Sequence, residues 1–213
     1  MTPLQRTRQY AEDVLAGNEI AGPHVRNACK RFLHDLDHAG ERGLWFDEEA
    51  AGRAMWFFEN VLMLPAEGQF DGVPFNLHPS QAFKIGNIFG WKREDGTRRF
   101  RRAYIEEGKG NGKSPMAGGI ALMGLCGDGE SGSQVYAIAS HKDQAGILFR
   151  DAVSMVKASP TLQKRLAFSG GEGREYNIAH HASASFFRPA SRDVGKTGSG
   201  YRPYFVLADE VHE

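Results

Sequence analysis

The chain has 213 residues, and its 26 Lys plus Arg balance its 26 Asp plus Glu, so the formal net charge is zero. This balance gives no general attraction to nucleic acid or to acidic membranes, and any such contact has to use a local patch. Two cysteines, Cys29 and Cys126, indicate neither a disulfide framework nor a zinc site, and no apolar run reaches the roughly 18 residues of a membrane span. We expect a soluble cytoplasmic protein with no membrane partner, long enough for one α/β domain and an N-terminal extension.

The first 65 residues are predicted to be helical. A short helix is expected around Leu4 to Leu15, and Asp47 is a candidate N-cap for a later one. Apolar residues recur at three- and four-residue spacing in two stretches: Val25, Cys29, Phe32, Leu33 and Leu36, then Ala50, Ala54, Phe57, Phe58, Val61 and Leu62. A loop from Leu64 to Ser80 follows. We therefore expect a helical extension over residues 1–65 and a catalytic domain over residues 66–213.

From Arg102 onward, short apolar runs alternate with helical spacing. Strands are expected at 103–105, 135–139 and 205–208, a further strand pair at 176–179 and 185–187, and helices at 113–125 and 144–156. Strand, helix, strand in this order predicts right-handed βαβ units. The fold class is therefore α/β, with a mostly parallel sheet flanked by helices.

The stretch EEGKGNGKSPMAGG, residues 106–119, is similar to the phosphate-loop pattern GxxxxGK(S/T), with Glu107 in place of the leading glycine. Gly108, Gly110 and Gly112 allow backbone amides to converge on an anion, and a helix starting at the next residue adds its positive end. In such a loop Lys113 reaches the β- and γ-phosphates of ATP. The Ser114 hydroxyl takes one coordination position of Mg²⁺.

A glycine-rich turn with a solvated lysine is the alternative interpretation, and it is preferred for the second copy, Gly195-Lys196-Thr197, which lacks a flanking strand and helix. Around the first copy, the expected strand and apolar helix favour a phosphate loop. The stretch YFVLADE adds a strand that ends in two acids, Asp209 and Glu210. In a nucleotide hydrolase the aspartate of such a pair holds the Mg²⁺ shell, and the glutamate polarises the attacking water.

These segments resemble the ATPase domain of the large terminase subunit, the motor that packages double-stranded DNA into tailed-phage heads. The likeness runs from about Phe75 to the end and rests on segment order and on four phrases: Gly90-Trp91-Lys92, Asn111-Gly112-Lys113-Ser114, Asp143-Gln144-Ala145 and Asp209-Glu210-Val211-His212-Glu213. The resemblance implies a P-loop NTPase of the RecA-like, additional-strand type. It also implies that the chain stops before the nuclease domain of that family, so that no nuclease function falls on these residues.

The resemblance further implies roles for individual residues. Lys109 stands where the family usually has a γ-phosphate-sensing arginine, Gln81 matches the adenine-contacting glutamine, Asp209 is the metal-linked aspartate and Glu210 the catalytic glutamate. Asn111 belongs to the ATP-binding loop with its neighbours Gly108 to Ser114. The implied partners are double-stranded DNA, a small terminase subunit, a portal and further copies in a homo-oligomeric ring, all in the host cytoplasm.

Two other functions stay open at this stage: another motor of the same superfamily, such as a helicase, and a nucleotide-binding or assembly fragment with negligible turnover. A basic cluster, Arg98, Arg99, Arg101 and Arg102, could meet DNA phosphate, but a solvated turn is favoured. The adjacent His180 and His181 would point to opposite faces of a strand, which disfavours a metal site. Trp45, Trp56 and Trp91 are expected in the core.

Overall fold

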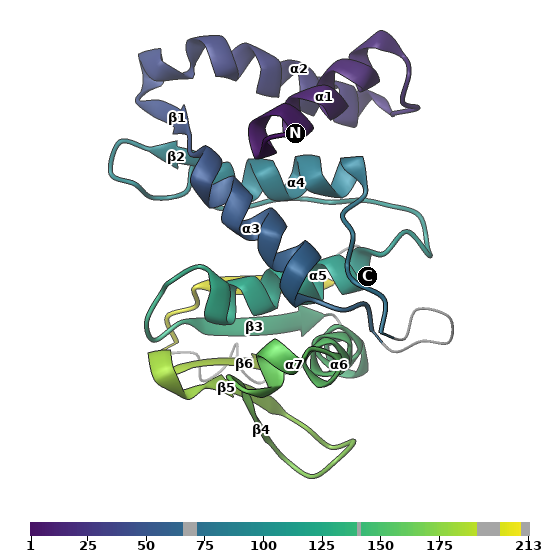
Figure 1. Cartoon of the computed structure of the whole chain (residues 1–213), viewed down its shortest axis with the longest axis vertical. Coiled ribbons are helices and arrows are strands. Elements are labelled where there is room, and N and C mark those ends of the chain that lie inside the picture. The colour runs from purple at the N-terminus through teal and green to yellow at the C-terminus, as the bar shows by residue number, and fades with distance from the viewer. Residues whose placement is uncertain (66–71, 140–141, 191–200, 210–213) are drawn as a thin grey trace. The chain divides into compact units, whose positions relative to one another are not determined.

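The fold is described from a computed structural model, which covers residues 1–65, 72–139, 142–190 and 201–209, with the backbone alone at 142–144 (Figure 1). The helices are α1 (Pro3–Ala16), α2 (Pro23–His38), α3 (Glu48–Val61), α4 (Pro79–Gly90), α5 (Lys113–Leu122), α6 (Lys142–Ala158) and α7 (Pro160–Gln163). The strands are β1 (Leu44–Phe46), β2 (Trp91–Arg93), β3 (Gln134–Ala139), β4 (Ala167–Ser169), β5 (Asn177–His180), β6 (Ser185–Pro189) and β7 (Phe205–Asp209). Within these ranges, no helix combines the length and apolar character required to cross a membrane.

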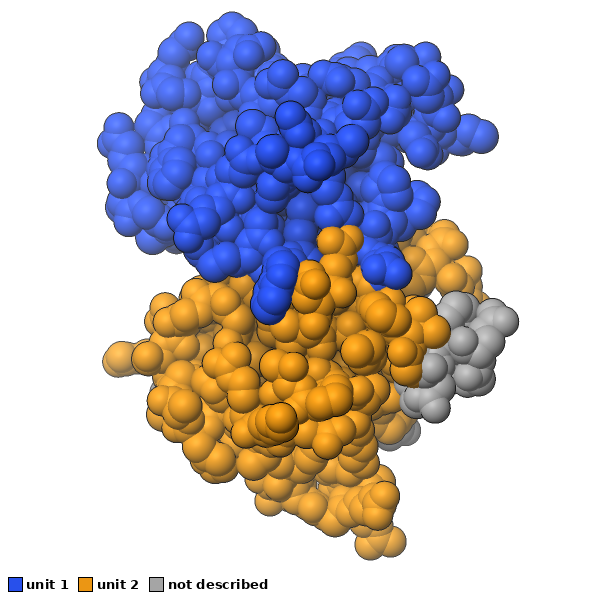
Figure 2. Space-filling model, in the orientation of Figure 1, with its two compact units in different colours: residues 1–56, 76–106 blue, residues 57–75, 107–213 orange. Residues whose placement is uncertain are grey.

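The chain divides into two compact units, coloured separately in Figure 2. Unit 1 comprises Met1–Trp56 and Asn76–Glu106, and unit 2 comprises Phe57–Phe75 and Glu107–Glu213. The first division falls inside α3, so one helix contributes to both units. This division differs from the single boundary between residues 65 and 66 that the sequence suggested.

Unit 1 packs α1 against α2 and α4 around an aromatic core. Phe32 is the centre of this core, because its ring lies edge-on to those of Phe46, Phe83 and Trp91, with centroid separations of 5.9, 5.6 and 6.1 Å. Gly86 permits the close approach of α4 to α1, since a Cβ there would lie 2.4 Å from Thr7 Oγ1. The small antiparallel sheet of β1 and β2 closes the core, with Phe46 opposite Trp91.

Unit 2 is built on a five-stranded sheet in the order β4-β5-β6-β3-β7. β3 pairs in parallel with β6 on one side and with β7 on the other. The pairings β4 with β5 and β5 with β6 are antiparallel. Both α5 and α6 pack on the sheet, and Val135 and Ala137 of β3 are fully buried. The expected parallel sheet is therefore found around β3 only, and the sheet as a whole is mixed.

Most expected elements are present, and Asp47 caps α3 as predicted by accepting the amide of Ala50 at 2.9 Å. The strand expected at 103–105 is wrong: these residues have irregular backbone. An apolar run of three residues is short for a strand, and Tyr104 is 73% exposed. The run therefore has no buried face that would stabilise pairing with another strand. Among the tryptophans only Trp91 is in the core, whereas Trp45 and Trp56 are 48% and 60% exposed.

Candidate nucleotide-binding site

The glycine loop leads directly into α5. Gly110 and Gly112 have φ angles of 85° and 75°, a left-handed conformation that residues with a Cβ seldom adopt. Gly112 is also the N-cap of α5, and it has no side chain with which to cap the first helical amides. The start of the helix therefore presents backbone donors and its positive dipole end without a competing side-chain acceptor, which suits an anion.

Lys113 and Ser114 are the first two residues of α5, and both are half-buried. Pro115 follows without disturbing the helix, because the first turn has no intrahelical acceptor for its missing amide. The first helical hydrogen bond runs from the amide of Met116 to the carbonyl of Gly112, at 3.0 Å. The two side chains that the sequence assigns to phosphate and metal thus leave from one rigid turn.

The remaining loop positions differ in exposure. Lys109 lies in the turn before Gly110 and is exposed, so its ammonium is accessible to a ligand. Asn111 lies beside Gly108, where an added Cβ would be 3.5 Å from the side-chain nitrogen Nδ2 of Asn111. Gly108 therefore admits a side chain by space alone, in contrast to Gly110 and Gly112, whose backbone angles demand glycine.

Asp209 ends β7 and lies opposite Ala139, the last residue of the parallel neighbour β3. Its carboxylate is therefore at the carboxyl edge of the parallel strands, where open α/β sheets bind their ligands. α5 packs on β7 within the same unit, so Lys113, Ser114 and Asp209 belong to one packed assembly. Glu210, the expected catalytic base, lies outside the described residues, as does the second Gly-Lys-Thr sequence at 195–197.

Gln81 belongs to unit 1, in the first turn of α4. Its Oε1 accepts the amide of His78 at 3.0 Å and closes a capping box. Helix α4 was not predicted from the sequence, although the spacing of Ala82, Ile85 and Phe89 behind Pro79 was a signal for a helix. The capping role occupies Oε1 and leaves the Nε2 group of Gln81 as a donor for another partner.

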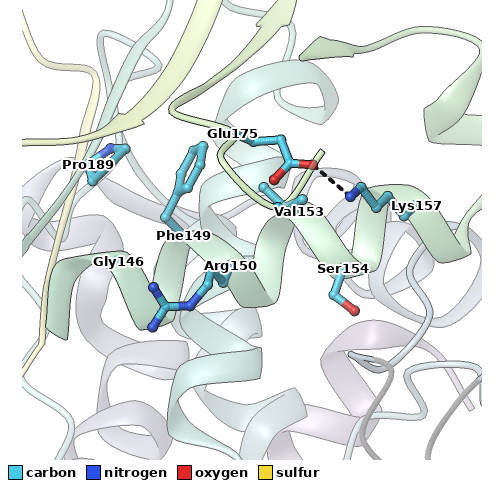
Figure 3. Close-up of a pocket in the computed structure, with 9 residues that line it drawn as sticks. Gly146, Phe149, Arg150, Val153, Ser154, Lys157, Glu175 and Pro189 are labelled. Atoms are coloured by element: carbon cyan, nitrogen blue, oxygen red, sulfur yellow. Dashed lines mark hydrogen bonds and ion pairs between the residues drawn. The ribbon is translucent and has the colours of Figure 1, made fainter. Parts of the chain in front are cut away.

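A separate hollow of about 360 Å³ lies along α6 (Figure 3). Its wall includes Phe149, Arg150 and Lys157 of α6, together with Glu175 and Pro189. Lys157 is paired with Glu175 at 2.6 Å, and the hydrogen bond from this lysine lowers the pKa of the carboxyl. None of the residues predicted to bind nucleotide lines this hollow, so it is no part of the candidate site.

The basic cluster at 98–102 does not act as one surface. The side chain of Arg99 is only 12% exposed and forms an ion pair with Asp35, and its guanidinium lies over the rings of Trp91 and Phe100. Arg101 and Arg102 are exposed. Arg99 therefore belongs to the core of unit 1.

Within the described residues, no group of three or more His, Cys, Asp or Glu side chains could hold a metal ion, and His180 instead contacts Ser183 Oγ at 2.7 Å.

The loop, the helix that it caps and the parallel strand ending in Asp209 have the features of a nucleotide-binding α/β protein. The model of the family described as "Terminase large subunit, ATPase domain" matches residues 79–213. The chain therefore belongs to the family of terminase large subunit ATPase domains. This confirms the resemblance seen in the sequence.

Two individual proteins are similar to this chain. The large terminase subunit of Enterobacteria phage HK97 is 29% identical over 164 residues, which cover 75% of this chain and 30% of that protein. The crystal structure of the HK97 bacteriophage large terminase superposes with a TM-score of 0.60 and 24% identity, covering 74% of this chain and 30% of that one. The chain thus spans about 30% of the length of the relative, and the structural likeness supports the fold.

Proposed function

We propose that this chain is the ATPase part of a large terminase subunit, which hydrolyses ATP with Mg²⁺ to drive double-stranded DNA into a phage prohead. The observation that carries the proposal is the glycine-capped start of α5, which bears Lys113 and Ser114, in a chain of the terminase ATPase family. We assign it the P-loop, RecA-like fold with an additional strand. The parallel arrangement of β6, β3 and β7 supports that assignment.

The residues present fit a magnesium nucleotide. Ser114 offers a hydroxyl and Asp209 a carboxylate, the oxygen donors that Mg²⁺ prefers in proteins. The bound cation would supply charge neutralisation on the phosphate oxygens. Lys113 and the loop amides bind the β- and γ-phosphates and stabilise the negative charge of the transition state, because they are oriented before the reaction begins.

The remaining roles follow from the family. Glu210 orients and polarises the attacking water, with its carboxylate accepting a proton as the water attacks. The exposed ammonium of Lys109 contacts the γ-phosphate, and Gln81 reads the adenine base with its amide. All three roles stay predictions of the resemblance.

Site-directed variants test the proposal through two separate readouts, nucleotide affinity and phosphate release. We expect Lys113→Ala to abolish turnover, because its ammonium neutralises charge on the transferring phosphoryl group. We expect Glu210→Gln to retain ATP affinity while phosphate release collapses. Unchanged phosphate release in Glu210→Gln would reject the assignment.

The wider packaging role is tested with DNA and with partner proteins. We propose double-stranded DNA, a small terminase subunit and a portal as partners, a homo-oligomeric ring as the working assembly, and the host cytoplasm as its location. Stimulation of phosphate release by double-stranded DNA would support this role. ATP binding in calorimetry with no turnover, with or without DNA, would instead indicate a nucleotide-binding assembly module. The family match does not favour the helicase alternative.

A further inference from the structure

Helix α5 ends in a π-helical turn, Met123–Gly127, which we call the π-turn and which packs against the start of β7. At Gly124 an added Cβ would lie 2.4 Å from Cδ2 and 2.8 Å from Cε2 of Phe205, so this ring packs directly on the glycine backbone. A second contact joins the same two segments, since the hydroxyl of Tyr204 donates to Asp128 Oδ2 at 2.6 Å. The π-turn is therefore held to the first residues of β7.

The π-turn is also held from the side of β3. Ser133 is 1% exposed, and its hydroxyl donates to the carbonyl of Gly124 at 2.8 Å. The amide of Ser133 in turn donates to Ser185 Oγ at 3.0 Å. Gly124 is thus fixed on both sides, by a ring against its Cα and by a hydroxyl at its carbonyl.

Both elements run from this contact to the candidate site. The ten residue steps from Gly124 back to Ser114 span roughly 15 Å of helix, at about 1.5 Å per residue. The four steps from Phe205 to Asp209 span roughly 13 Å of strand, at about 3.3 Å per residue. Because α5 packs on β7, these similar lengths bring Ser114 and Asp209 to the same edge of the sheet.

We propose that the contact between Gly124 and Phe205 is a positioning contact for the nucleotide site. It fixes the position of α5 along the direction of β7, and this position determines the separation of the Ser114 hydroxyl from the Asp209 carboxylate. This inference rests on the proposed function, in which those two groups share one cation with ATP. Gly124 and Phe205 touch neither nucleotide nor metal, and they act through the elements that carry the ligands.

The test is the gain in nucleotide affinity that Mg²⁺ produces. Calorimetry with a non-hydrolysable ATP analogue, in Mg²⁺ and in EDTA, gives this gain as a ratio for each variant. In Gly124→Ala the new methyl group has to displace Phe205. We expect the affinity in EDTA to stay within about twofold, while the Mg²⁺-dependent gain falls about ten- to 100-fold, the usual range for residues that orient metal ligands.

Gly118→Ala is the matched control in the same helix. Its added Cβ would meet Ala152 at 3.5 Å, an ordinary contact, so we expect an unchanged ratio. Adding Phe205→Leu to Gly124→Ala removes the obstructing ring atoms and should recover much of the gain. Should Gly124→Ala fail to fold, Phe205→Leu alone serves, because it loosens the contact and should lower the ratio with the EDTA affinity preserved.

The outcomes separate the two hypotheses. A wild-type protein with no Mg²⁺-dependent gain would contradict the proposed function itself. A wild-type gain that Gly124→Ala and Phe205→Leu leave unchanged would overturn only the positioning role. An equal loss of affinity in Mg²⁺ and in EDTA would also overturn it, because a loss of that kind indicates damage to the fold in general.

Discussion

Asp35 Oδ2 lies 2.6 Å from Arg99 Nη1, and the two side chains are only 3% and 12% exposed. Arg42 contacts the other carboxylate oxygen of Asp35. The guanidinium of Arg99 lies 5.1 Å from the ring centroid of Trp91, so the ion pair continues into the aromatic core of unit 1. This cluster joins α2 to the segment after β2, two parts of the chain far apart in sequence.

Replacing Arg99 by Met should strongly destabilise unit 1. The variant leaves the buried carboxylate of Asp35 with one partner fewer, and breaking a buried pair in this way typically costs about 3–5 kcal/mol. Arg101→Met is the matched control, because Arg101 is exposed and surface changes usually stay within about 0.5 kcal/mol. Urea denaturation followed by tryptophan fluorescence measures both. Equal midpoints for the two variants would show that the ion pair contributes nothing.

The same pair should make unit 1 sensitive to acid. Burial alone would raise the pKa of the Asp35 carboxyl, but Arg99 and Arg42 outweigh that effect and hold the pKa below its ordinary value. A lowered folded-state pKa stabilises the protein above the unfolded value of about 3.9, and this contribution is lost as the pH falls through the folded value.

The test compares the wild type with Asp35→Asn across pH. We expect the difference in free energy of unfolding to be largest near neutral pH and to shrink below about pH 4, where the Asp35 carboxyl of the unfolded chain begins to bind a proton that the folded chain does not. Urea denaturation at a series of pH values measures it. A difference that is constant down to acid unfolding would rule out the charge of Asp35 as the cause.

Ser159 should be a stabilising residue of unit 2. Its buried hydroxyl donates to the carbonyl of Val61 at 2.6 Å and accepts the amide of Leu162 at 3.4 Å, so it joins the end of α3 to the cap of α7. Ser159→Ala leaves that carbonyl without its donor, which should cost about 1–3 kcal/mol. The control Ser131→Ala lies in an exposed turn. Thermal unfolding that shifts equally in both variants would contradict this role.

The two lysines of the loop should give different kinetic phenotypes. Lys113 begins α5 and is half-buried, whereas Lys109 lies exposed in the preceding turn. We expect Lys109→Ala to lower kcat with little change in ATP affinity, and Lys109→Arg to retain or increase kcat, because a guanidinium offers a bidentate fork to phosphate. Steady-state phosphate release and ATP titration separate these parameters. A Lys109→Ala variant with wild-type kcat would exclude a role in hydrolysis.

The sequence was informative where the pattern was local. Helical spacing predicted α1, α2, α3 and α6, Asp47 was correctly identified as a cap, and the glycine pattern predicted a loop that ends at the start of α5. These features depend on neighbouring residues, so they can be recognised without knowledge of the fold.

The misinterpretations depend on contacts between distant residues. Arg99 was grouped with its sequence neighbours as a surface residue, but its environment is set by Asp35, 64 positions earlier. Similarly, nothing in the local pattern at Gly124 indicates that Phe205 would need its space. The antiparallel direction of β4, β5 and β6 could not be predicted either, because the direction of strand pairing is decided by tertiary packing.

Each of the two units is built from two separate segments of the chain, and this affects the choice of fragments for expression. The matched family region begins at residue 79, yet Phe58 packs so closely on α5 that a Cβ at Gly119 would lie 2.4 Å from its ring. A fragment cloned from residue 79 would expose that face of α5 to solvent and would be prone to aggregate. A fragment that keeps unit 2 intact would have to retain residues 57–75 in addition to residues 107–213.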